Sequence, residues 1–462
     1  MNSDRLWLRF VVMALVSALL PGFGLITFVV ITAATGGGSG AWYHAAIQAH
    51  GTAMLMGWGG AMILGVALHF LPRLRGTKLV GRGWVPVLFW LLAGGLTLRI
   101  VGQFCCATLD ATAPHTAVTI MTMAVAAGVW LQAIAVWGLL AVLAATFRAG
   151  PPLPKTHGFR QITPLLLVAA SALVLAQLLW SVSVLENIFG GRNLSTLPLG
   201  PQWAAEDLML FGFIAAISMA MSSRLFPLTF RIQLPRPRWL KIAAVFLAGG
   251  VALTLAGGLG IISDLSDPSA GRCASLAALA YAAGLLAGTV GVQVFRHRKP
   301  IVGNQPPYRI AEDPAAVGVA SAYLWVVVAA LFLLGFALHQ FGVHVPLPLA
   351  DRNLARHTAG AGFMTLLILS VGWKMLPGFG GGRPRARGLM WTAVGLGNAA
   401  ALLRILPALL TWGIRPERDW SRLLFPLAGL AGLGAILAFA LALTISLGKR
   451  ESAHAGPDKT RS

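Results

Sequence analysis

The stretch "AHGTAMLMGWGGAMILGVALHFLP", Ala49–Pro72, is almost entirely apolar and begins with a histidine set directly against a glycine. It is long enough to cross a hydrocarbon core of about 30 Å as a helix. A histidine at the edge of such a helix is costly unless its ring has a partner. The stretch therefore predicts a membrane span with a functional group near one end.

The composition extends this prediction to the whole chain. Of the 462 residues, 57% are hydrophobic and 11% are charged, which excludes a soluble protein with an ordinary polar surface. Because long apolar runs recur throughout, we predict an all-α integral membrane protein with twelve transmembrane helices. The runs cover approximately residues 7–33, 47–71, 84–106, 115–146, 162–185, 205–226, 239–262, 273–295, 315–339, 355–376, 389–412 and 423–447.

The formal net charge of +21 does not indicate a nucleic-acid partner, because the basic residues are not gathered in one patch. They lie in alternate loops, such as "RLRGTKLVGR" and "RHRKPIVGNQPPYR", while the intervening loops carry Asp110, Asp264 and Asp267. This is the positive-inside pattern. It predicts a multi-pass protein of the bacterial inner (plasma) membrane with both termini in the cytoplasm. We call the opposite side the outer side.

Three of the predicted helices end in a proline that follows a glycine-aromatic pair by fifteen residues. The prolines are Pro72, Pro227 and Pro377, and the pairs are Gly57-Trp58, Gly212-Phe213 and Gly362-Phe363. The spacings are 155 and 150 residues in both series. Arg99 and Arg404, in the third and eleventh helices, are 305 residues apart, which is the sum of these spacings. The pattern indicates an internal repeat.

The repeat predicts three pseudo-equivalent units of four helices within one membrane domain. They would cover residues 1–150, 151–300 and 301–448, followed by a basic cytoplasmic tail at 449–462. The second, sixth and tenth helices would be equivalent.

Two histidines lie at matched depth in equivalent helices. His50 precedes its proline by 22 residues and His357 by 20, so their depths differ by only about 3 Å. Two such imidazoles can occupy both axial positions of a haem iron, and Gly51 would remove a side chain where a flat macrocycle approaches. A pair of hydrogen-bonded structural histidines at the headgroup boundary is the alternative. The spacing alone does not decide between them.

The sequences around both histidines resemble haem-copper oxidase subunit I. The quoted stretch looks like that family's second helix, and "ARHTAGAGFMTLLILSVGWKMLPGFGGG" is similar to its tenth. The resemblance implies twelve helices in three four-helix arcs, with His50 and His357 as axial ligands of one low-spin haem.

The ligands of a second, catalytic centre are missing. The family's tenth helix has a His-x-His pair, but the first of these positions is Ala355 here, and the sixth and seventh helices contain no histidine. The predicted middle of the membrane also lacks an Asp or Glu that could relay protons. A terminal oxidase or nitric oxide reductase is therefore not expected, and whether the chain is an enzyme stays open.

A closer resemblance is to the NnrS family, which is linked to nitric oxide stress. The segments "MSSRLFPLTFR", "AYLWVVVAALFLLG" and "AALLRILPAL" look like it, together with those around His50 and His357. The family tends to have His-x-His at the start of the second helix, whereas this chain has His50 and Thr52. This departure puts a second metal site in doubt.

Arg99 and Arg404 lie inside predicted helices, where an unpaired guanidinium costs about 2.5 to 3.5 kcal/mol or more. Haem propionates on the outer side would neutralise both with bidentate geometry. Snorkelling to the interface or hydrogen bonds between helices are the alternatives.

A copper ion is a further candidate cofactor on the outer side. Cys105, Cys106, His44 and His115 map there and offer the soft and imidazole ligands that copper binds. A disulfide between Cys273 and one of the adjacent pair is the alternative.

These features together predict a haem-binding membrane protein of NnrS or oxidase type that transfers electrons or senses redox state or nitric oxide. Its partners would be the lipid bilayer and a periplasmic cytochrome or a quinol. A haem-bearing electron-transfer subunit for a quinol or cytochrome enzyme and a twelve-span transporter without haem are the alternatives.

Overall fold

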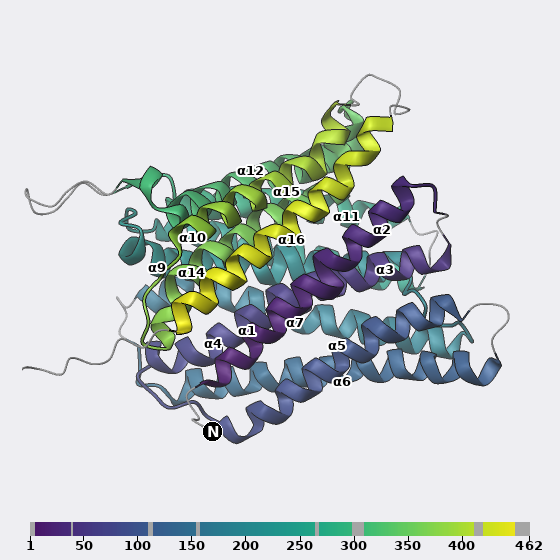
Figure 1. Ribbon diagram of the computed structural model, residues 1–462, viewed down its shortest axis with the longest axis horizontal. Coiled ribbons are helices and arrows are strands. Elements are labelled where there is room, and N and C mark those ends of the chain that lie inside the picture. The colour runs from purple at the N-terminus through teal and green to yellow at the C-terminus, as the bar shows by residue number, and fades with distance from the viewer. Residues whose placement is uncertain are drawn as a thin grey trace, which may run out of the picture.

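The computed structural model describes residues 5–37, 40–109, 114–153, 158–263, 268–297, 309–410 and 419–448. Within these residues, twelve helical spans are long and apolar enough to cross a membrane (Figure 1). The predicted all-α membrane fold is thus confirmed at this level. Asp110, Asp264, Asp267 and the basic tail lie outside the described residues.

The first six spans are built from α1 (Leu6–Ser17), η2 (Ala18–Gly24) and α2 (Leu25–Ala34); α3 (Ala41–Thr52), η3 (Ala53–Gly60) and α4 (Ala61–Leu74); η4 (Arg82–Trp84) and α5 (Val85–Thr108); α6 (His115–Ala149); α7 (Gly158–Phe189); and α8 (Leu199–Asp207), η5 (Leu208–Ile214) and α9 (Ala215–Thr229). The second span begins before the predicted residue 47, so His44 lies on α3.

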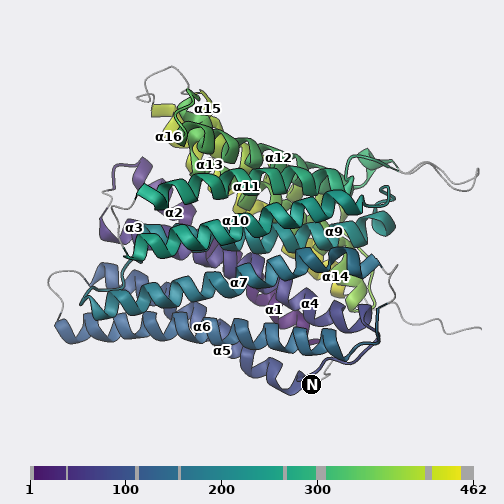
Figure 2. The ribbon, with the colours of Figure 1, turned by 180° about the vertical axis from the view of Figure 1, so that it is seen from behind.

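The last six spans are α10 (Pro237–Ser263); α11 (Pro268–Val292); α12 (Pro314–Gln340), preceded by η6 (Ile310–Glu312); α13 (Arg352–His357), η8 (Thr358–Thr365) and α14 (Leu366–Phe379), preceded by η7 (Leu347–Ala350); α15 (Arg387–Leu410); and α16 (Asp419–Gly448). In the view from behind, α10 and α11 lie side by side (Figure 2).

The second, sixth and tenth spans are the most buried of the twelve and form the centre of the bundle. Each contains a π-helical segment, and these segments begin at residues 53, 208 and 358. The three segments contact one another. At Gly59 a Cβ atom would lie 2.6 Å from Met364 Sδ and 3.1 Å from Ile214 Cδ1, so a larger residue there would force these two side chains to move.

The glycines that mark the sequence repeat pack against the preceding span in every case. A Cβ at Gly57 would lie 2.5 Å from Ser17, one at Gly212 2.6 Å from Ala172, and one at Gly362 2.4 Å from Trp325. All three helices also continue two residues past their proline, to Leu74, Thr229 and Phe379.

The lateral surface of the helix bundle is apolar, as expected of a surface that contacts lipid. Exposed side chains include Trp90, Phe189 and Val245. The described chain begins and ends at the same end of the bundle, where α1 starts and α16 finishes (Figure 1).

Candidate functional site

His50 and His357 each stand just before a π-helical segment of a central span. His50 lies in the last turn of α3, and His357 is the last residue of α13. The α13 helix begins after Asp351, whose Oδ1 accepts a hydrogen bond of 2.7 Å from the Asn353 N–H and so caps the helix. Both imidazoles are half-buried.

The Nδ1 atom of His50 lies 2.9 Å from the carbonyl oxygen of Gly22 on the first span. That carbonyl is placed by a break in the helix, because Pro21 has no N–H and Gly22 adopts the non-helical angles φ −78° and ψ −106°. The break in η2 thus supplies the partner that orients the His50 ring.

The Nδ1 atom of His357 lies 2.9 Å from the carbonyl oxygen of Asn353, one turn earlier in α13. A carbonyl can only accept, so Nδ1 is the protonated nitrogen in both rings. Among the described residues, neither Nε2 atom has a hydrogen-bond partner. An imidazole held in this tautomer offers the Nε2 lone pair, which is the form that binds a metal ion.

The two histidines and Arg404 form one electrostatic group. His357 interacts with His50, and both interact with the Arg404 guanidinium from α15. The Arg404 Cζ lies 4.7 Å from the centre of the Phe425 ring, and the Asp351 carboxylate acts on its charge. The predicted pair and one of the two predicted arginines are therefore brought together.

Arg99 lies elsewhere, against the fifth and sixth spans. Its Cζ stacks 4.3 Å above the Trp180 ring, and its Nη2 lies 3.4 Å from Gln202 Oε1. The charge that acts on it is that of the Glu206 carboxylate. The structure thus separates Arg99 from the group that contains Arg404, although the sequence repeat makes the two arginines equivalent.

The glycine beside His50 contacts protein. A Cβ atom at Gly51 would lie 3.1 Å from Glu206 Oε1, so this glycine lets α3 approach the carboxylate on α8. Gly360, one turn after His357, is different, because a Cβ there would meet no atom within 4 Å.

A buried charge cluster that the sequence analysis missed joins α8 to α13. Asp207 Oδ1 accepts a hydrogen bond of 2.7 Å from Arg356 Nε, and Asp207 also pairs with Arg352. Arg356 Nη1 lies 3.9 Å from Glu206 Oε2. The signals were present, since "ED" ends α8 and two arginines four residues apart share one face of α13.

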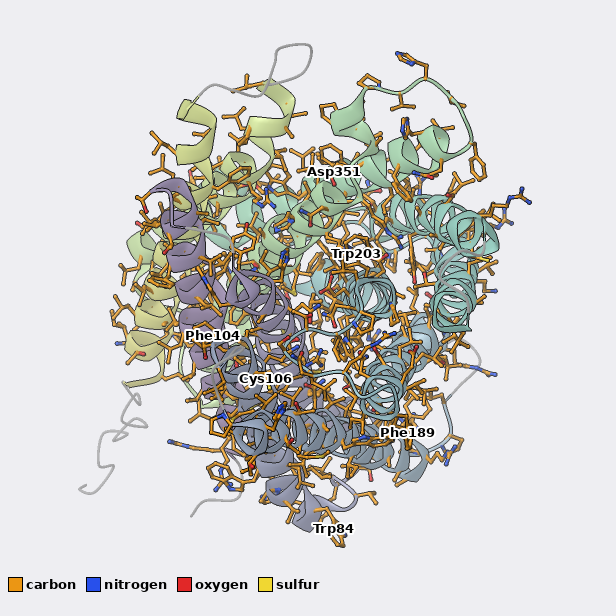
Figure 3. All side chains as sticks on the ribbon, turned by 90° about the vertical axis from the view of Figure 1, so that its right-hand side faces the viewer. Trp84, Phe104, Cys106, Phe189, Trp203 and Asp351 are labelled. Atoms are coloured by element: carbon orange, nitrogen blue, oxygen red, sulfur yellow. The ribbon has the colours of Figure 1, made fainter. Side chains whose placement is uncertain are left out.

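The end of the bundle that carries the two histidines also carries Asp351 and Trp203, which Figure 3 labels. Trp203 contributes to the cluster on α8 and α13: the Arg356 guanidinium lies 5.5 Å from the centre of its ring and donates a hydrogen bond of 3.2 Å to its carbonyl. Aromatic and ionic contacts together fix the turn that precedes His357.

The four candidate copper ligands do not form a metal centre in the described part of the chain. Cys106 is buried with its Sγ 3.9 Å from Thr122 Oγ1, and Cys105 is half-buried. His44 and His115 are exposed. Across the described ranges, no group of three or more His, Cys, Asp or Glu side chains could hold a metal ion, and all three cysteines, including Cys273, are free thiols.

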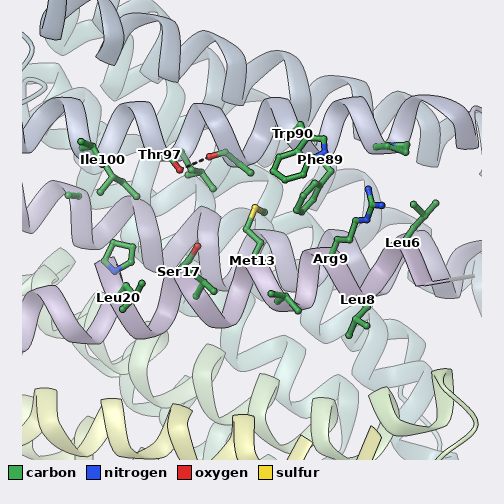
Figure 4. A pocket seen from close by; sticks show the side chains of 18 of the residues that line it. Leu6, Leu8, Arg9, Met13, Ser17, Leu20, Phe89, Trp90, Thr97 and Ile100 are labelled. Atoms are coloured by element: carbon green, nitrogen blue, oxygen red, sulfur yellow. Dashed lines mark hydrogen bonds between the residues drawn. The ribbon is translucent and has the colours of Figure 1, made fainter. Parts of the chain in front are cut away.

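Two large cavities lie among the spans, and one of them reaches Ala49, the residue before His50. One, of about 1780 Å³, runs between the first and third spans and is lined by apolar residues such as Met13, Phe89 and Trp90 (Figure 4). The other, of about 970 Å³, lies between α4, α7 and α14, with Phe70 and Phe379 among its lining. Neither is lined by His50 or His357.

Comparisons with models of known protein families and with curated proteins find no match to this chain. A functional assignment therefore depends on the residues and their geometry.

Proposed function

We propose that this chain is a haem protein of the bacterial inner membrane, related to the NnrS family and to haem-copper oxidase subunit I, which carries one low-spin haem between His50 and His357. The observation that carries the proposal is the pair of imidazoles that share one electrostatic group and donate Nδ1–H to backbone carbonyls. Both rings would thus present Nε2 as an axial ligand.

The surrounding residues fit a haem in three ways. The Gly22 and Asn353 carbonyls fix the orientation and basicity of the axial rings. Arg404 supplies a positive charge beside both histidines, as a propionate would require. Gly360 leaves open space one turn from His357. Arg99 does not share these contacts, so we assign the propionate contact to Arg404 alone.

A haem with two protein ligands supplies one-electron exchange and has no open coordination position. The protein residues would then set its potential and limit its contact with water. Electron transfer with a periplasmic cytochrome or a quinol, or sensing in the response to nitric oxide, suits such a site better than bond-making catalysis.

The architecture supports an oxidase-like scaffold of three units. The three central π-helical segments begin 155 and 150 residues apart, which are the spacings of the prolines and glycine-aromatic pairs. Equivalent glycines pack on equivalent neighbouring spans. We therefore propose units at residues 1–150, 151–300 and 301–448, with both termini cytoplasmic.

The reduced-minus-oxidised visible spectrum of the purified protein tests the haem proposal. We expect sharp low-spin bands in the wild type and their loss in His50→Ala and in His357→Ala. The matched control is His44→Ala, which removes an exposed histidine from the same helix and should keep the bands. Intact wild-type protein that shows no haem bands after haem-replete expression would refute the proposal.

Two further measurements separate electron transfer from sensing in the response to nitric oxide. Reduction of the haem by a quinol or by a cytochrome would identify the electron partner. A deletion strain with unaltered sensitivity to a nitric oxide donor would rule out the nitric oxide response.

A transporter without haem is the second candidate, because two observations favour it. The first span is broken at Gly22, and buried polar side chains surround Arg99. Broken helices and a polar site within the membrane are features of transporters. Absence of haem from the intact protein would make this candidate the leading one.

A further inference from the structure

Arg99 is a buried cation whose hydrogen-bonding capacity is largely unused. The side chain has 0% exposure, and its Nε and Nη1 atoms have no hydrogen-bond partner. Its remaining nitrogen, Nη2, makes the long contact of 3.4 Å with Gln202 Oε1. A guanidinium carries five N–H donors, and leaving them unpaired in a buried site is costly.

The two side chains known to act on the Arg99 guanidinium, Gln202 and Glu206, are already engaged with other partners. Gln202 Oε1 already accepts a bond of 2.8 Å from Trp180 Nε1, and its Nε2 donates to Glu206 Oε1 at 2.7 Å. The second oxygen of Glu206 faces Arg356. Glu206 therefore acts on Arg99 only through space.

The charges of the connected cluster do not balance. Arg99, Arg352 and Arg356 are three cations, whereas Glu206 and Asp207 are two anions, so one positive charge is in excess. Asp351 acts on Arg356 but also on Arg404, which is a fourth cation. An excess buried charge of this kind requires a counterion.

We propose that Arg99 anchors a buried binding site for one small monovalent oxyanion of the carboxylate type, between the second, third, fifth and sixth spans. The anion would accept hydrogen bonds from the free guanidinium donors and would neutralise the cluster. The proposed site includes neither His50 nor His357.

The packing around Arg99 restricts the ligand. The Trp180 ring covers one face of the guanidinium at 4.3 Å, so an anion must approach in the guanidinium plane. On the backbone side, α6 approaches so closely that a Cβ at Gly128 would lie 2.6 Å from the Arg99 nitrogen. Because the guanidinium is fully buried and lines neither large cavity, the proposed ligand is limited to a small planar anion such as formate.

Calorimetric titration of the purified full-length protein with sodium formate tests the site. We expect saturable binding of one formate per chain, weakened about tenfold or more in Arg99→Met, because charge-assisted hydrogen bonds are lost. Arg404→Met is the matched control, since it removes the repeat-related arginine beside the histidines, and it should keep wild-type affinity. Protein without haem should bind formate equally, which separates this proposal from the haem proposal.

A second variant keeps the test decisive where Arg99→Met does not fold. Gln103 is fully buried on α5, one turn after Arg99. Gln103→Glu would place a carboxylate beside the guanidinium as an i, i+4 pair. We expect this variant to fold and to lose formate binding, because the counterion is then built in. Absence of saturable binding in the wild type, which would mean that Arg99 is solvated by internal water only, or undiminished binding in either variant, would overturn the proposal.

Discussion

The neighbours of each ring decide what His50 and His69 of the second span can do. His50 donates Nδ1–H to Gly22 and keeps Nε2 available. His69, at the other end of the span, is buried against aromatic rings: it stacks on Phe379 at 4.0 Å and meets Trp7 edge-on. His50 can therefore bind a ligand through Nε2, whereas the His69 ring is packed against aromatic side chains.

The proposed haem should respond to Arg404 and not to Arg99. A positive charge favours the reduced iron, so Arg404→Met should lower the midpoint potential by roughly 60 mV, equivalent to about 1.4 kcal/mol for one electron. Arg99→Met should leave the potential unchanged. Spectroelectrochemical titration of both variants measures this, and equal shifts would contradict the separation of the two arginines.

Removing the carboxylate that joins α8 to α13 should destabilise the protein strongly. Asp207→Asn would leave Arg352 and Arg356 without their main partner in a buried site, where breaking such a pair costs about 3–5 kcal/mol. Denaturant titration in detergent measures the change. Because Asp207 helps to fix the turn before His357, haem content should also fall.

Glu312→Gln provides the control for that measurement. Glu312 pairs with Arg309 at 2.8 Å, but both side chains are more than half exposed, so the pair should contribute little. A loss of stability in Glu312→Gln as large as that in Asp207→Asn would show that burial does not set the strength of these ion pairs.

At the scale of elements, the π-helical segments η3, η5 and η8 bring the three central spans into contact. Side chains of π-helical residues are offset from the ordinary helical positions, and such segments are frequent at functional sites. Here η3 and η8 directly follow the turns that carry His50 and His357. The close packing of glycine against a neighbouring span then fixes the depth of both turns.

A methyl group at Gly57 should weaken this packing. Gly57→Ala would place Cβ 2.5 Å from Ser17, and overpacking of this kind costs about 1–3 kcal/mol. Gly94→Ala is the control, because nothing lies within 4 Å of a Cβ there and alanine favours a helix. The thermal unfolding midpoint should fall for the first variant and stay or rise for the second. The reverse order would contradict the packing described.

For the whole molecule, the distribution of charge predicts orientation in the membrane. Lys78 and Arg192 are exposed residues in loops at opposite ends of the bundle. In a cysteine-free background, a membrane-impermeant thiol reagent applied to intact spheroplasts should label Arg192→Cys, whereas Lys78→Cys should react only after lysis. Labelling of Lys78→Cys alone from outside would reverse the proposed topology.

The sequence by itself determined the helical class and the twelve apolar spans, and it predicted matched depths for His50 and His357. These features follow from hydropathy and from distances along one helix, which require no knowledge of neighbouring segments. The sequence also predicted equal roles for Arg99 and Arg404, because a repeat records equivalent positions and says nothing about what surrounds each one.

The tertiary structure decided which groups surround each charged side chain. It placed Arg404 beside the histidines, Arg99 against Trp180 and Gln202, and Glu206 against Gly51. It also joined Asp207 to arginines that lie about 150 positions later in the chain. Hydrogen bonds and ion pairs act over a few ångströms between spans, and their partners are fixed only when the helices pack.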